Sequence, residues 1–560
     1  MDLITYALIR SALFASAREM KAAMMRTAAS PIIHSGGDAS AAIFDARIRL
    51  VAQGNDIPTM LGSAVVSTRA SVEALGLANL RPGDVIISND AYLGGGNHQP
   101  DVQLTRPVFH KGEVVAFTMT RGHWSDIGGQ SPGSFDPDTW DIFGEGLRIP
   151  PVLLFRDDAL VPDICRLIVT NTRDPDSRMM DIQAQYAGTF VGEQRILELI
   201  EKYGEPVLAA AMSRSLDHSE ALVRAEIAAM PDGTYRAEDW IEPVGDGPLV
   251  PVCVEITIAG DAMTVDFTGS SPQVRGGINC PYSVTCNSVW FALKAVTNKD
   301  AAINEGCYRP VSITAPPGSV VNCAYPASVV SGNTETSPRI IDLLLKALAP
   351  ALPHRVIGAS HCAASAANFS GLDPDAARCA ALGRTYATAI DVHAGGLGAR
   401  PDKDGVNAVR VHVGNTSTSP VELIEHLSPL TIESWEIVPD SGGAGRWRGG
   451  CTTRRTYRIH YEEATFTVIG ERERVPPEGR FGGASGSPFI CRVESADGER
   501  RVAAKGGKVI LKRGDRVVVQ PAGSGGYGLP GDRERDRVRD DLLDGYISGE
   551  AARTLYGLDV

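Results

Sequence analysis

The chain has 560 residues, a formal net charge of −13, 43% hydrophobic residues and 22% charged residues. This length and composition are typical of a globular protein built from three or four domain-sized units. The acidic balance argues against nucleic-acid binding as the main task, because phosphate neutralisation requires clustered Lys and Arg.

The first 27 residues predict an amphipathic helix. Charged residues interrupt the apolar ones at helical spacing, and no small-residue cleavage site follows. No apolar segment has the length needed to cross a membrane. The ten cysteines are scattered and form no C-x-x-C pair, which indicates buried thiols in a reducing compartment. We therefore expect a cytoplasmic protein without a signal peptide or membrane contact.

The segment from Pro31 to Gln53 alternates small, apolar and acidic residues and predicts a β-hairpin. Its strands would bring Asp38 or Asp45 close to the later loop that carries His98. Either carboxylate could complete a metal site there. The alternative is that both aspartates only form turns.

Two short β-branched segments within residues 84–151 predict buried strands, at Val85–Ser88 and Val114–Thr118. The glycines Gly94–Gly96 cannot extend a strand and allow a sharp turn of the backbone. Loops just beyond a strand end are the usual place for functional side chains on a rigid scaffold. We therefore expect the functional residues of this chain on the loops of this region.

Three potential metal ligands lie on these loops: His98, Asp101 and His123. Imidazole and carboxylate groups on glycine-rich turns suit a catalytic divalent metal, which needs a firm hold and an open coordination position. If the two predicted strands are antiparallel neighbours, His123 returns to the edge that carries His98. Because His-x-x-Asp is a short pattern, the alternative is a set of ordinary polar loop residues.

Hydrophobic periodicity and turn signals predict the remaining elements. Helices are expected at 65–76, 179–203, 205–230, 282–296 and 332–348, and strands between 235 and 268 and near 311–314. Polar groups around Ser337, at the start of one helix, could bind an anion or form a plain N-cap, and we favour the cap.

These elements predict an α+β fold, with mixed and antiparallel sheets in a chain of several subdomains. The N-terminal element is helical and the C-terminal region is rich in strands. We expect an α/β region over residues 1–170 that carries the metal site, a helical segment over 171–232, a central α/β region over 233–384 and a β-rich, glycine-rich region over 385–560.

Nucleotide-binding motifs are missing from the sequence. Gly523–Gly528 fits G-x-G-x-x-G, but Leu529-Pro530-Gly531 follows where a dinucleotide fold needs a helix. There is also no G-x-x-x-x-G-K-[ST] motif, and no G-x-S-x-G elbow of an α/β-hydrolase. The chain is therefore not expected to hold ATP phosphates in a P-loop.

Longer motifs occur along the whole chain. They are Asn89-Asp90-Ala-Tyr-Leu-Gly-Gly-Gly-Asn-His98-Gln-Pro-Asp101-Val, Arg121-Gly-His123-Trp-Ser-Asp126-Ile-Gly-Gly, Glu145-Gly-Leu-Arg-Ile-Pro-Pro, Gly332-Asn-Thr-Glu-Thr-Ser and Asp440-Ser-Gly-Gly-Ala-Gly-Arg-Trp-Arg-Gly-Gly. Together they closely resemble the hydantoinase B/oxoprolinase family, essentially from end to end.

The resemblance implies a B-type subunit of an ATP-dependent cyclic amide hydrolase. In that family an A-type partner of the acetate-kinase-like superfamily binds ATP and phosphorylates the carbonyl oxygen of the substrate. The B-type chain completes the reaction at a divalent metal, here expected to be zinc, manganese or iron. By similarity the ligands would be Asp38, from Asp38-Ala-Ser40, with His98, Asp101 and His123, and Asp45 remains a rival to Asp38.

Two residues that follow His123 bear on the site. Many family members have His-His where this chain has His123-Trp124, and the apolar ring of Trp124 is expected to make the pocket drier. Asp126 is predicted to act as a general base or to orient His123. The alternative for Asp126 is a structural cap of the turn at Gly128-Gly129.

The family contains hydrolases of hydantoins, oxoproline and lactams, and carboxylases of ketones such as acetone and acetophenone. The length of the chain and a metal whose simplest use is water activation favour hydrolysis. One alternative is a subunit of an ATP-dependent ketone carboxylase. The other is a non-catalytic scaffold that shapes the active site of the A-type subunit.

Overall fold

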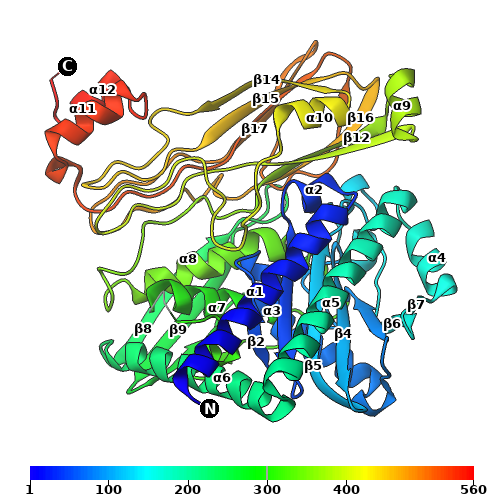
Figure 1. Ribbon diagram of the computed structural model, residues 1–560. Helices are drawn as coiled ribbons and strands as arrows, with labels where there is room; N and C mark the ends of the chain where they lie inside the picture. Colours follow the sequence, from blue (N-terminus) through cyan, green and yellow to red (C-terminus); the bar gives the residue numbers. More distant parts are fainter. Residues whose placement is uncertain (298–300, 560) are drawn as a thin grey trace.

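The computed structural model describes residues 1–297 and 301–559, and it confirms the expected α+β class. Four β-sheets and their helices form two stacked parts within these residues (Figure 1). One part contains the N-terminal and central elements. The other contains the β-rich C-terminal strands, drawn in yellow to orange above α8 and α2.

The first sheet has seven antiparallel strands in the order β2-β1-β5-β4-β3-β6-β7. Their bounds are β1 (Ala39–Asp45), β2 (Leu50–Gln53), β3 (Val85–Ser88), β4 (Asp101–His110), β5 (Glu113–His123), β6 (Val152–Arg156) and β7 (Ala159–Leu160). The hairpin of β1 and β2 is as expected. The two strands predicted from β-branched runs, β3 and β5, are not neighbours, because the unpredicted strand β4 lies between them.

Two long helices, α1 (Leu3–Thr27) and α5 (Pro175–Tyr203), cover one face of this sheet (Figure 1). Gly188 of α5 lies where the three elements meet. A Cβ at this position would lie 2.8 Å from Cγ2 of Thr120 on β5 and 2.9 Å from the carbonyl oxygen of Met20 on α1. The segment predicted as a separate helical region therefore packs directly on the sheet, and so does α6 (Glu205–Ala228) through β2.

The opposite face packs against three helices and a second sheet. The helices are α3 (Pro58–Leu75), α7 (Tyr282–Val296) and α8 (Ser337–Leu348), and the sheet has the order β11-β10-β9-β8, with β8 (Gly233–Ile241), β9 (Val250–Ala259), β10 (Ala262–Asp266) and β11 (Val311–Thr314). Buried side chains from all these elements form one continuous core. The layers alternate helix, sheet, helix, sheet, as expected when each sheet buries an apolar face.

Helix α8 continues from a π-helical turn at Gly332–Thr336. The predicted N-cap at Ser337 is wrong, because its hydroxyl donates to the carbonyl oxygen of Asn333, one turn back in a continuous helical segment. The turn places Asn333 next to the predicted metal ligands, as described below.

The C-terminal part is a sandwich of two antiparallel sheets with a shared core. One sheet contains β13 (Tyr386–Val392), β12 (Ala366–Leu372), β16 (Glu463–Ile469) and β19 (Val509–Lys512), and the other β14 (Leu430–Ile437), β15 (Thr453–Ile459), β20 (Arg516–Gln520), β17 (Ile490–Ser495) and β18 (Gly498–Arg501). The sandwich begins with β12, before the boundary expected at residue 385. The remaining helices are α2 (Pro31–His34), α4 (Pro162–Thr170), α9 (Ala376–Leu382), α10 (Val421–Leu427), α11 (Arg535–Leu543) and α12 (Gly549–Thr554).

The glycines of Gly523–Gly528 serve close backbone packing. A Cβ on Gly525 would lie 2.1 Å from the carbonyl oxygen of Glu478, and the segment leads into a 3-10 turn at Pro530–Asp532 instead of a helix. The rejection of a dinucleotide fingerprint is thus confirmed.

All ten cysteines are free thiols, and eight of them are buried. Among the helices described here, none combines the length and the apolar character that a membrane span requires.

Candidate metal centre

Three adjacent strands end at the same point and bring the candidate ligands together. Asp101 opens β4 and is the cross-strand partner of His123, the last residue of β5. Asp38 directly precedes β1, and its carbonyl oxygen accepts a hydrogen bond from the amide of His123. Asp38, Asp101 and His123 lie at the ends of adjacent antiparallel strands, so sheet register fixes their relative positions.

His98 reaches the same point from the loop before β4. Its carbonyl oxygen accepts a hydrogen bond from the amide of Asp101, which closes a tight turn. Gly95 has a φ of +60°, and a Cβ on Gly96 would lie 2.6 Å from the carbonyl oxygen of Asn89. The expected glycine turn is therefore present, and it folds the loop back onto the end of the sheet.

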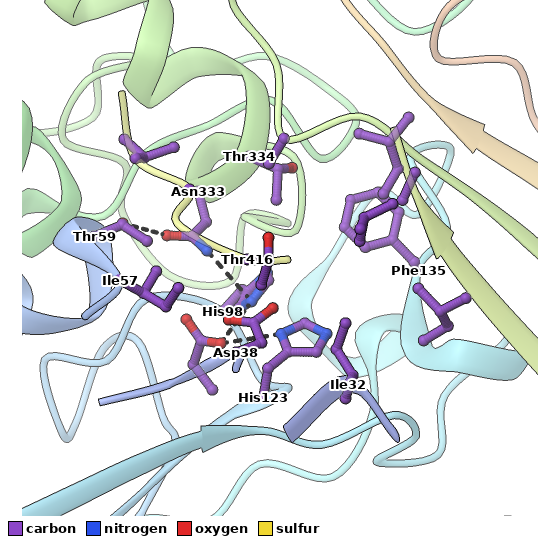
Figure 2. Close-up of a pocket in the computed structure, with 18 of the residues that line it drawn as sticks. Ile32, Asp38, Ile57, Thr59, His98, His123, Phe135, Asn333, Thr334 and Thr416 are labelled. Atoms are coloured by element: carbon purple, nitrogen blue, oxygen red, sulfur yellow. Dashed lines mark hydrogen bonds and ion pairs between the residues drawn. The ribbon is translucent and has the colours of Figure 1, made fainter. Parts of the chain in front are cut away.

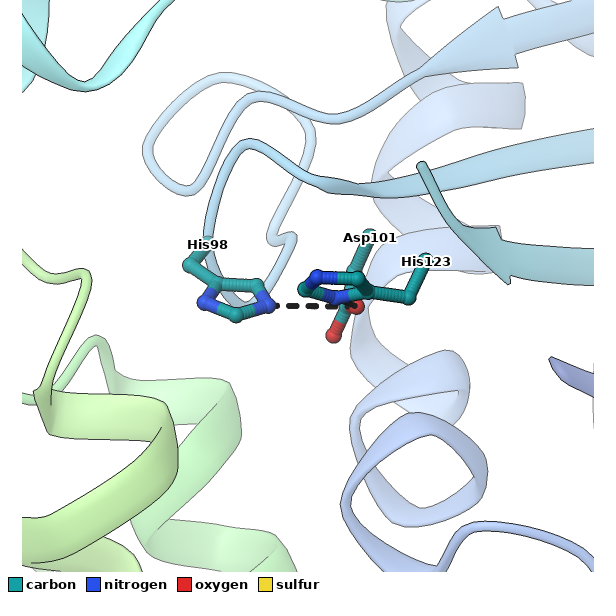
Figure 3. Close-up of side chains that lie close together, drawn as sticks. All are labelled: His98, Asp101 and His123. Carbon is teal, nitrogen blue, oxygen red and sulfur yellow. Dashed lines mark hydrogen bonds and ion pairs between the residues drawn. The ribbon is translucent and has the colours of Figure 1, made fainter. Parts of the chain in front are cut away.

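The side chains of His98, Asp101 and His123 form a compact group (Figure 3). Oδ1 of Asp101 lies 3.1 Å from Nε2 of His98 and 3.1 Å from Nδ1 of His123. One ligand atom from each of the three residues lies within 4.8 Å of the others. His98 and Asp101 are only 1% exposed, whereas His123 borders the pocket.

Neighbouring groups hold these side chains in orientation. Nδ1 of His98 faces the carbonyl oxygen of Val330 at 3.3 Å, which leaves Nε2 toward Asp101. The amide of Asn97 donates to Oδ2 of Asp101 at 3.0 Å. Such outer hydrogen bonds, to a backbone carbonyl or from an amide, are the usual supports of metal ligands.

The charge states follow from burial and mutual contact. Burial opposes ionisation of Asp101, but the two imidazoles outweigh it and hold the pKa of this carboxyl well below its ordinary value. Burial likewise disfavours the imidazolium form of His98, yet the charge of Asp101 and its hydrogen bond raise the pKa of His98. Asp101 is thus ionised, and its charge stabilises the protonated form of His98.

Asp38 contributes a second carboxylate, and this carboxylate is unpaired. Within the described residues its side chain makes no hydrogen bond or ion pair, and it faces the pocket beside His123 (Figure 2). Burial raises the pKa of Asp38, and His123 and Arg410 offset part of that effect. An unpaired, partly buried carboxylate next to two imidazoles is the arrangement expected of a ligand that awaits a cation.

Asp45, the rival of Asp38, lies at the other end of β1. A strand of seven residues separates the two, about 20 Å at ~3.3 Å per residue. Asp45 accepts hydrogen bonds from the amides of Arg47 and Arg49 and forms an ion pair with the guanidinium of Arg49 at 2.6 Å. Its role is the turn-forming one that the sequence also allowed.

Asp126 does not contact His123, and the general-base hypothesis does not fit its surroundings. Its two carboxylate oxygens accept hydrogen bonds from the amides of Gly128, Gly133 and Arg173, and from the guanidinium of Arg173 at 2.8 Å. The side chain is only 3% exposed. Asp126 therefore organises the turn at Gly128 and Gly129, which was the structural alternative.

Trp124 points away from the pocket, so the expectation that it dries the pocket is wrong. Its ring is fully buried and its Nε1 donates to Oε1 of Gln185 on α5 at 2.8 Å. Successive residues of an extended chain point to opposite faces, and since His123 faces the pocket, Trp124 faces the helical layer.

The ligand group opens into a pocket between the two parts of the molecule (Figure 2). Much of the lining is apolar: Ile32, Ile57, Phe135, Ile390, Val392 and Ile469. Besides the ligands, polar side chains line it as well: Thr59, Asn333, Thr334, Asn368, Thr416 and Arg410. An apolar lining with some polar groups is typical of a site for a small organic molecule.

The donor set fits a divalent cation. Two carboxylates and two imidazoles suit zinc, manganese or iron, and the pocket leaves space on one side of the group for a further ligand. The open carboxylate of Asp38 is the observation of this structure that supports the fit, because the fold exposes it to no other cation at ion-pair distance among the described residues.

Some residues of the pocket were not identified from the sequence. Asn333 reaches Nε2 of His98 at 3.3 Å from the π-helical turn, and its Oδ1 accepts a hydrogen bond from Thr59. Arg410 comes from a long loop after β13. Asn333 belongs to the motif Gly332-Asn-Thr-Glu-Thr-Ser, which was a usable signal, whereas no local pattern distinguishes Arg410.

Known proteins match this chain along its whole length. The chain is 34% identical over 565 residues to an uncharacterized protein of Methanocaldococcus jannaschii, with 100% of this chain and 96% of the relative covered. It is 33% identical over 567 residues to the caprolactamase subunit beta of Pseudomonas jessenii, with 100% and 96% covered.

Solved structures show the same fold. The crystal structure of the ATP-dependent caprolactamase from Pseudomonas jessenii matches with a TM-score of 0.93 and 31% identity, covering 100% of this chain and 97% of that chain. The nucleotide-free structure of acetone carboxylase matches with a TM-score of 0.90 and 20% identity, covering 100% and 80%. The hydantoinase B/oxoprolinase family model matches residues 2–530. The chain belongs to the hydantoinase B/oxoprolinase family.

Proposed function

We propose that this chain is the B-type subunit of an ATP-dependent cyclic amide hydrolase and completes ring opening at the Asp38–His98–Asp101–His123 group. The observation that carries the proposal is the convergence of these four donors at one end of β1, β5 and β4, facing a pocket with a largely apolar lining. The substrate class is a hydantoin, an oxoproline or a lactam.

The chemistry of an amide explains the need for such a site. Resonance makes a ring amide resistant to attack, and phosphorylation of its carbonyl oxygen removes that resonance and creates a leaving group. A divalent cation supplies a Lewis acid that polarises oxygen and makes water a nucleophile near neutral pH. In the proposal, the apolar lining with Phe135 and Ile390 holds the hydrocarbon part of the ring, and Asn333 and Thr59 orient its polar edge.

The proposal assigns ATP to an A-type partner subunit. The sequence has no P-loop, and the glycine-rich segment Gly523–Gly528 is filled by backbone packing. The names of the relatives support a partner, since caprolactamase has a subunit beta. The proposed sequence is phosphorylation of the substrate by the partner, followed by hydrolysis in the pocket described here.

The alternatives have weaker support. Similarity to acetone carboxylase at 20% identity supports a shared fold only. Trp124 lies outside the pocket and gives the carboxylase alternative no support. A non-catalytic scaffold does not account for the open carboxylate of Asp38.

Co-expression with the A-type partner tests the proposal. We expect ATP-dependent ring opening of a hydantoin, oxoproline or a lactam by the complex, and loss of activity when divalent metal is removed by a chelator and its return when metal is restored. No ring opening, together with ATP-dependent fixation of labelled bicarbonate onto a ketone, would establish the carboxylase alternative. An active complex whose B-type chain contains no metal would establish the scaffold.

A further inference from the structure

Arg410, a partly exposed residue, differs from the buried arginines described in this structure. Arg106, Arg178, Arg339, Arg455, Arg472 and Arg533 each lie within ion-pair distance of a carboxylate, and Arg121 donates several hydrogen bonds. The guanidinium of Arg410 has no hydrogen-bond or ion-pair partner among the described residues, although its Nε and Nη1 are buried. An unpaired buried cation costs free energy, so its retention calls for an anionic ligand.

The position of Arg410 indicates where that ligand binds. Arg410 lines the same pocket as Asp38, His98, Asp101 and His123. Burial lowers the pKa of Arg410, and Asp38 and Glu335 offset part of the effect without contact at ion-pair distance. The guanidinium therefore shares the pocket with the ligand group and lies close enough to Asp38 for their charges to interact.

The loop that carries Arg410 is fixed at several points. His412 has a φ of +57°, and its Nε2 lies 2.8 Å from Oδ1 of Asp342 on α8 and 3.0 Å from the hydroxyl of Ser360. The amide of Asn415 donates to the carbonyl oxygen of Asn55 at 3.0 Å. These contacts tie the loop to the part of the molecule that contains α8 and the first sheet.

Gly414 allows the guanidinium to lie against its own loop, since a Cβ there would be 3.0 Å from Nε of Arg410. The guanidinium of Arg410 is thus positioned by its own loop before a ligand binds. A preorganised guanidinium loses little side-chain entropy when it binds, and its planar donors match the oxygens of a phosphate or carboxylate.

Charge balance identifies the kind of anion. With a divalent cation between the carboxylates of Asp38 and Asp101 and with neutral imidazoles, those charges cancel. Arg410 then leaves one unit of positive charge in the pocket. A substrate activated by phosphorylation brings negative charge to this space, whereas an unmodified lactam is neutral.

We propose that Arg410 binds the phosphoryl group of the activated substrate, in the pocket that it shares with the Asp38–His98–Asp101–His123 group. The proposal rests on the function proposed above and adds a residue for recognition of the activated species. Arg410 then makes the pocket favour the phosphorylated substrate over the neutral ring, because only the phosphorylated substrate carries an oxyanion that the guanidinium can bind.

Inorganic phosphate is the probe, titrated by calorimetry into the metal-loaded full chain at constant ionic strength. We expect R410Q to weaken phosphate binding about ten- to a hundredfold, the loss of a charge-assisted hydrogen-bonded pair. R410K should give an intermediate loss, because it keeps the charge but not the planar donors. R166Q, which removes an exposed arginine, should leave the affinity within about twofold.

Metal content is the readout that a merely structural role would change. It should stay the same in R410Q and R410K as in the unmodified chain. Loss of metal from these variants would assign Arg410 to support of the ligand group and overturn the proposal. So would an R410Q affinity for phosphate within about twofold of the unmodified chain.

Two further measurements use the unmodified chain and do not depend on how the variants fold. With Mn²⁺ loaded, the phosphorus relaxation of bound phosphate should be strongly enhanced, and no enhancement would overturn the proposal. Acetate tests the other source of an oxyanion, a carboxylate of the substrate. Acetate binding as tight as that of phosphate would replace the phosphoryl assignment.

The two proposals fail separately. Arg410-dependent phosphate binding without ring opening by the partnered chain would count against the proposed function alone. Ring opening by the partnered chain with unchanged phosphate binding in R410Q would count against this inference alone.

Discussion

The two carboxylates of the candidate site differ in their hydrogen bonding. Asp101 is surrounded by donors, while Asp38 keeps an unpaired carboxylate beside it. The first is held by the protein, and the second is available to a cation. This difference distinguishes the group from a closed hydrogen-bond network, which would satisfy all of its members, and it supports the proposed metal site.

Replacement of a ligand by a similar side chain should remove bound metal while the fold is kept. We expect H98Q and D101N each to lower metal affinity by at least about tenfold, since loss of a mere outer partner already costs that much. Metal analysis of the purified proteins and far-UV circular dichroism measure the two effects. H354Q, at an exposed histidine, is the matched control. Full metal occupancy in either variant would refute the assignment.

Asp126 should matter for stability and not for metal binding. D126N weakens the pairing with Arg173, whose side chain is 29% exposed, and disturbs three backbone hydrogen bonds. We expect a decrease of about 1–3 kcal/mol in the free energy of unfolding, measured with denaturant, at unchanged metal content. Unchanged stability combined with abolished ring opening would instead restore Asp126 as a general base.

The helices and strands around the site explain why the sequence predicted only part of it. Helix α7 (Tyr282–Val296) has the bounds that periodicity predicts, and the glycine turn before His98 is also present. Strand β4 was missed because it contains Arg106 and Pro107, which are unusual in a central strand. Pro107 is tolerated because β3 is short and pairs only with Gln103–Thr105, and Arg106 pairs with Asp158 and Glu193.

Two other features of the site could not be predicted from the sequence. They are the direction of a side chain and the contacts between segments that are distant in the chain. Trp124 follows a ligand in the sequence but faces the opposite layer, which becomes clear only when the end of β5 is known. Arg410 enters the pocket from a loop held by His412 and Asn415, and its neighbours there come from distant segments. Local patterns carry no information on such tertiary contacts.

The crossing of α5 over β5 should tolerate no added methyl group. We expect G188A to lower the free energy of unfolding by about 1–2 kcal/mol, because overpacking against Thr120 and the backbone of Met20 outweighs the helix propensity gained. Denaturant unfolding measures the change. G531A, where a Cβ meets open space, should change stability by less than about 0.5 kcal/mol. Equal stability of the two variants would contradict the tight crossing.

The whole molecule places one pocket between an α/β part and a β-sandwich. Both parts supply walls, so the site depends on their docking: His98 and Asp101 come from the first, and Ile390, Arg410 and Ile469 from the second. The sequence has no P-loop motif, and the glycine-rich segment Gly523–Gly528 is filled by backbone packing. In the function proposed above, the energy of ATP therefore enters through the A-type partner.

The isolated chain should therefore neither bind nor hydrolyse ATP. Isothermal titration with Mg-ATP is expected to give no binding heat, and no phosphate release should be seen until the A-type partner is added. The partner complex itself is the positive control. Saturable ATP binding by this chain alone would contradict the proposed division of work.

The residues of the pocket are synthesised at different times. About 290 residues separate His123 from Arg410 along the chain. At a translation rate of about 5–20 residues per second, Arg410 leaves the ribosome roughly 15–60 s after the last of the four donors. The growing polypeptide thus carries every donor before it carries the residues that enclose them, which gives a cation an early opportunity to bind.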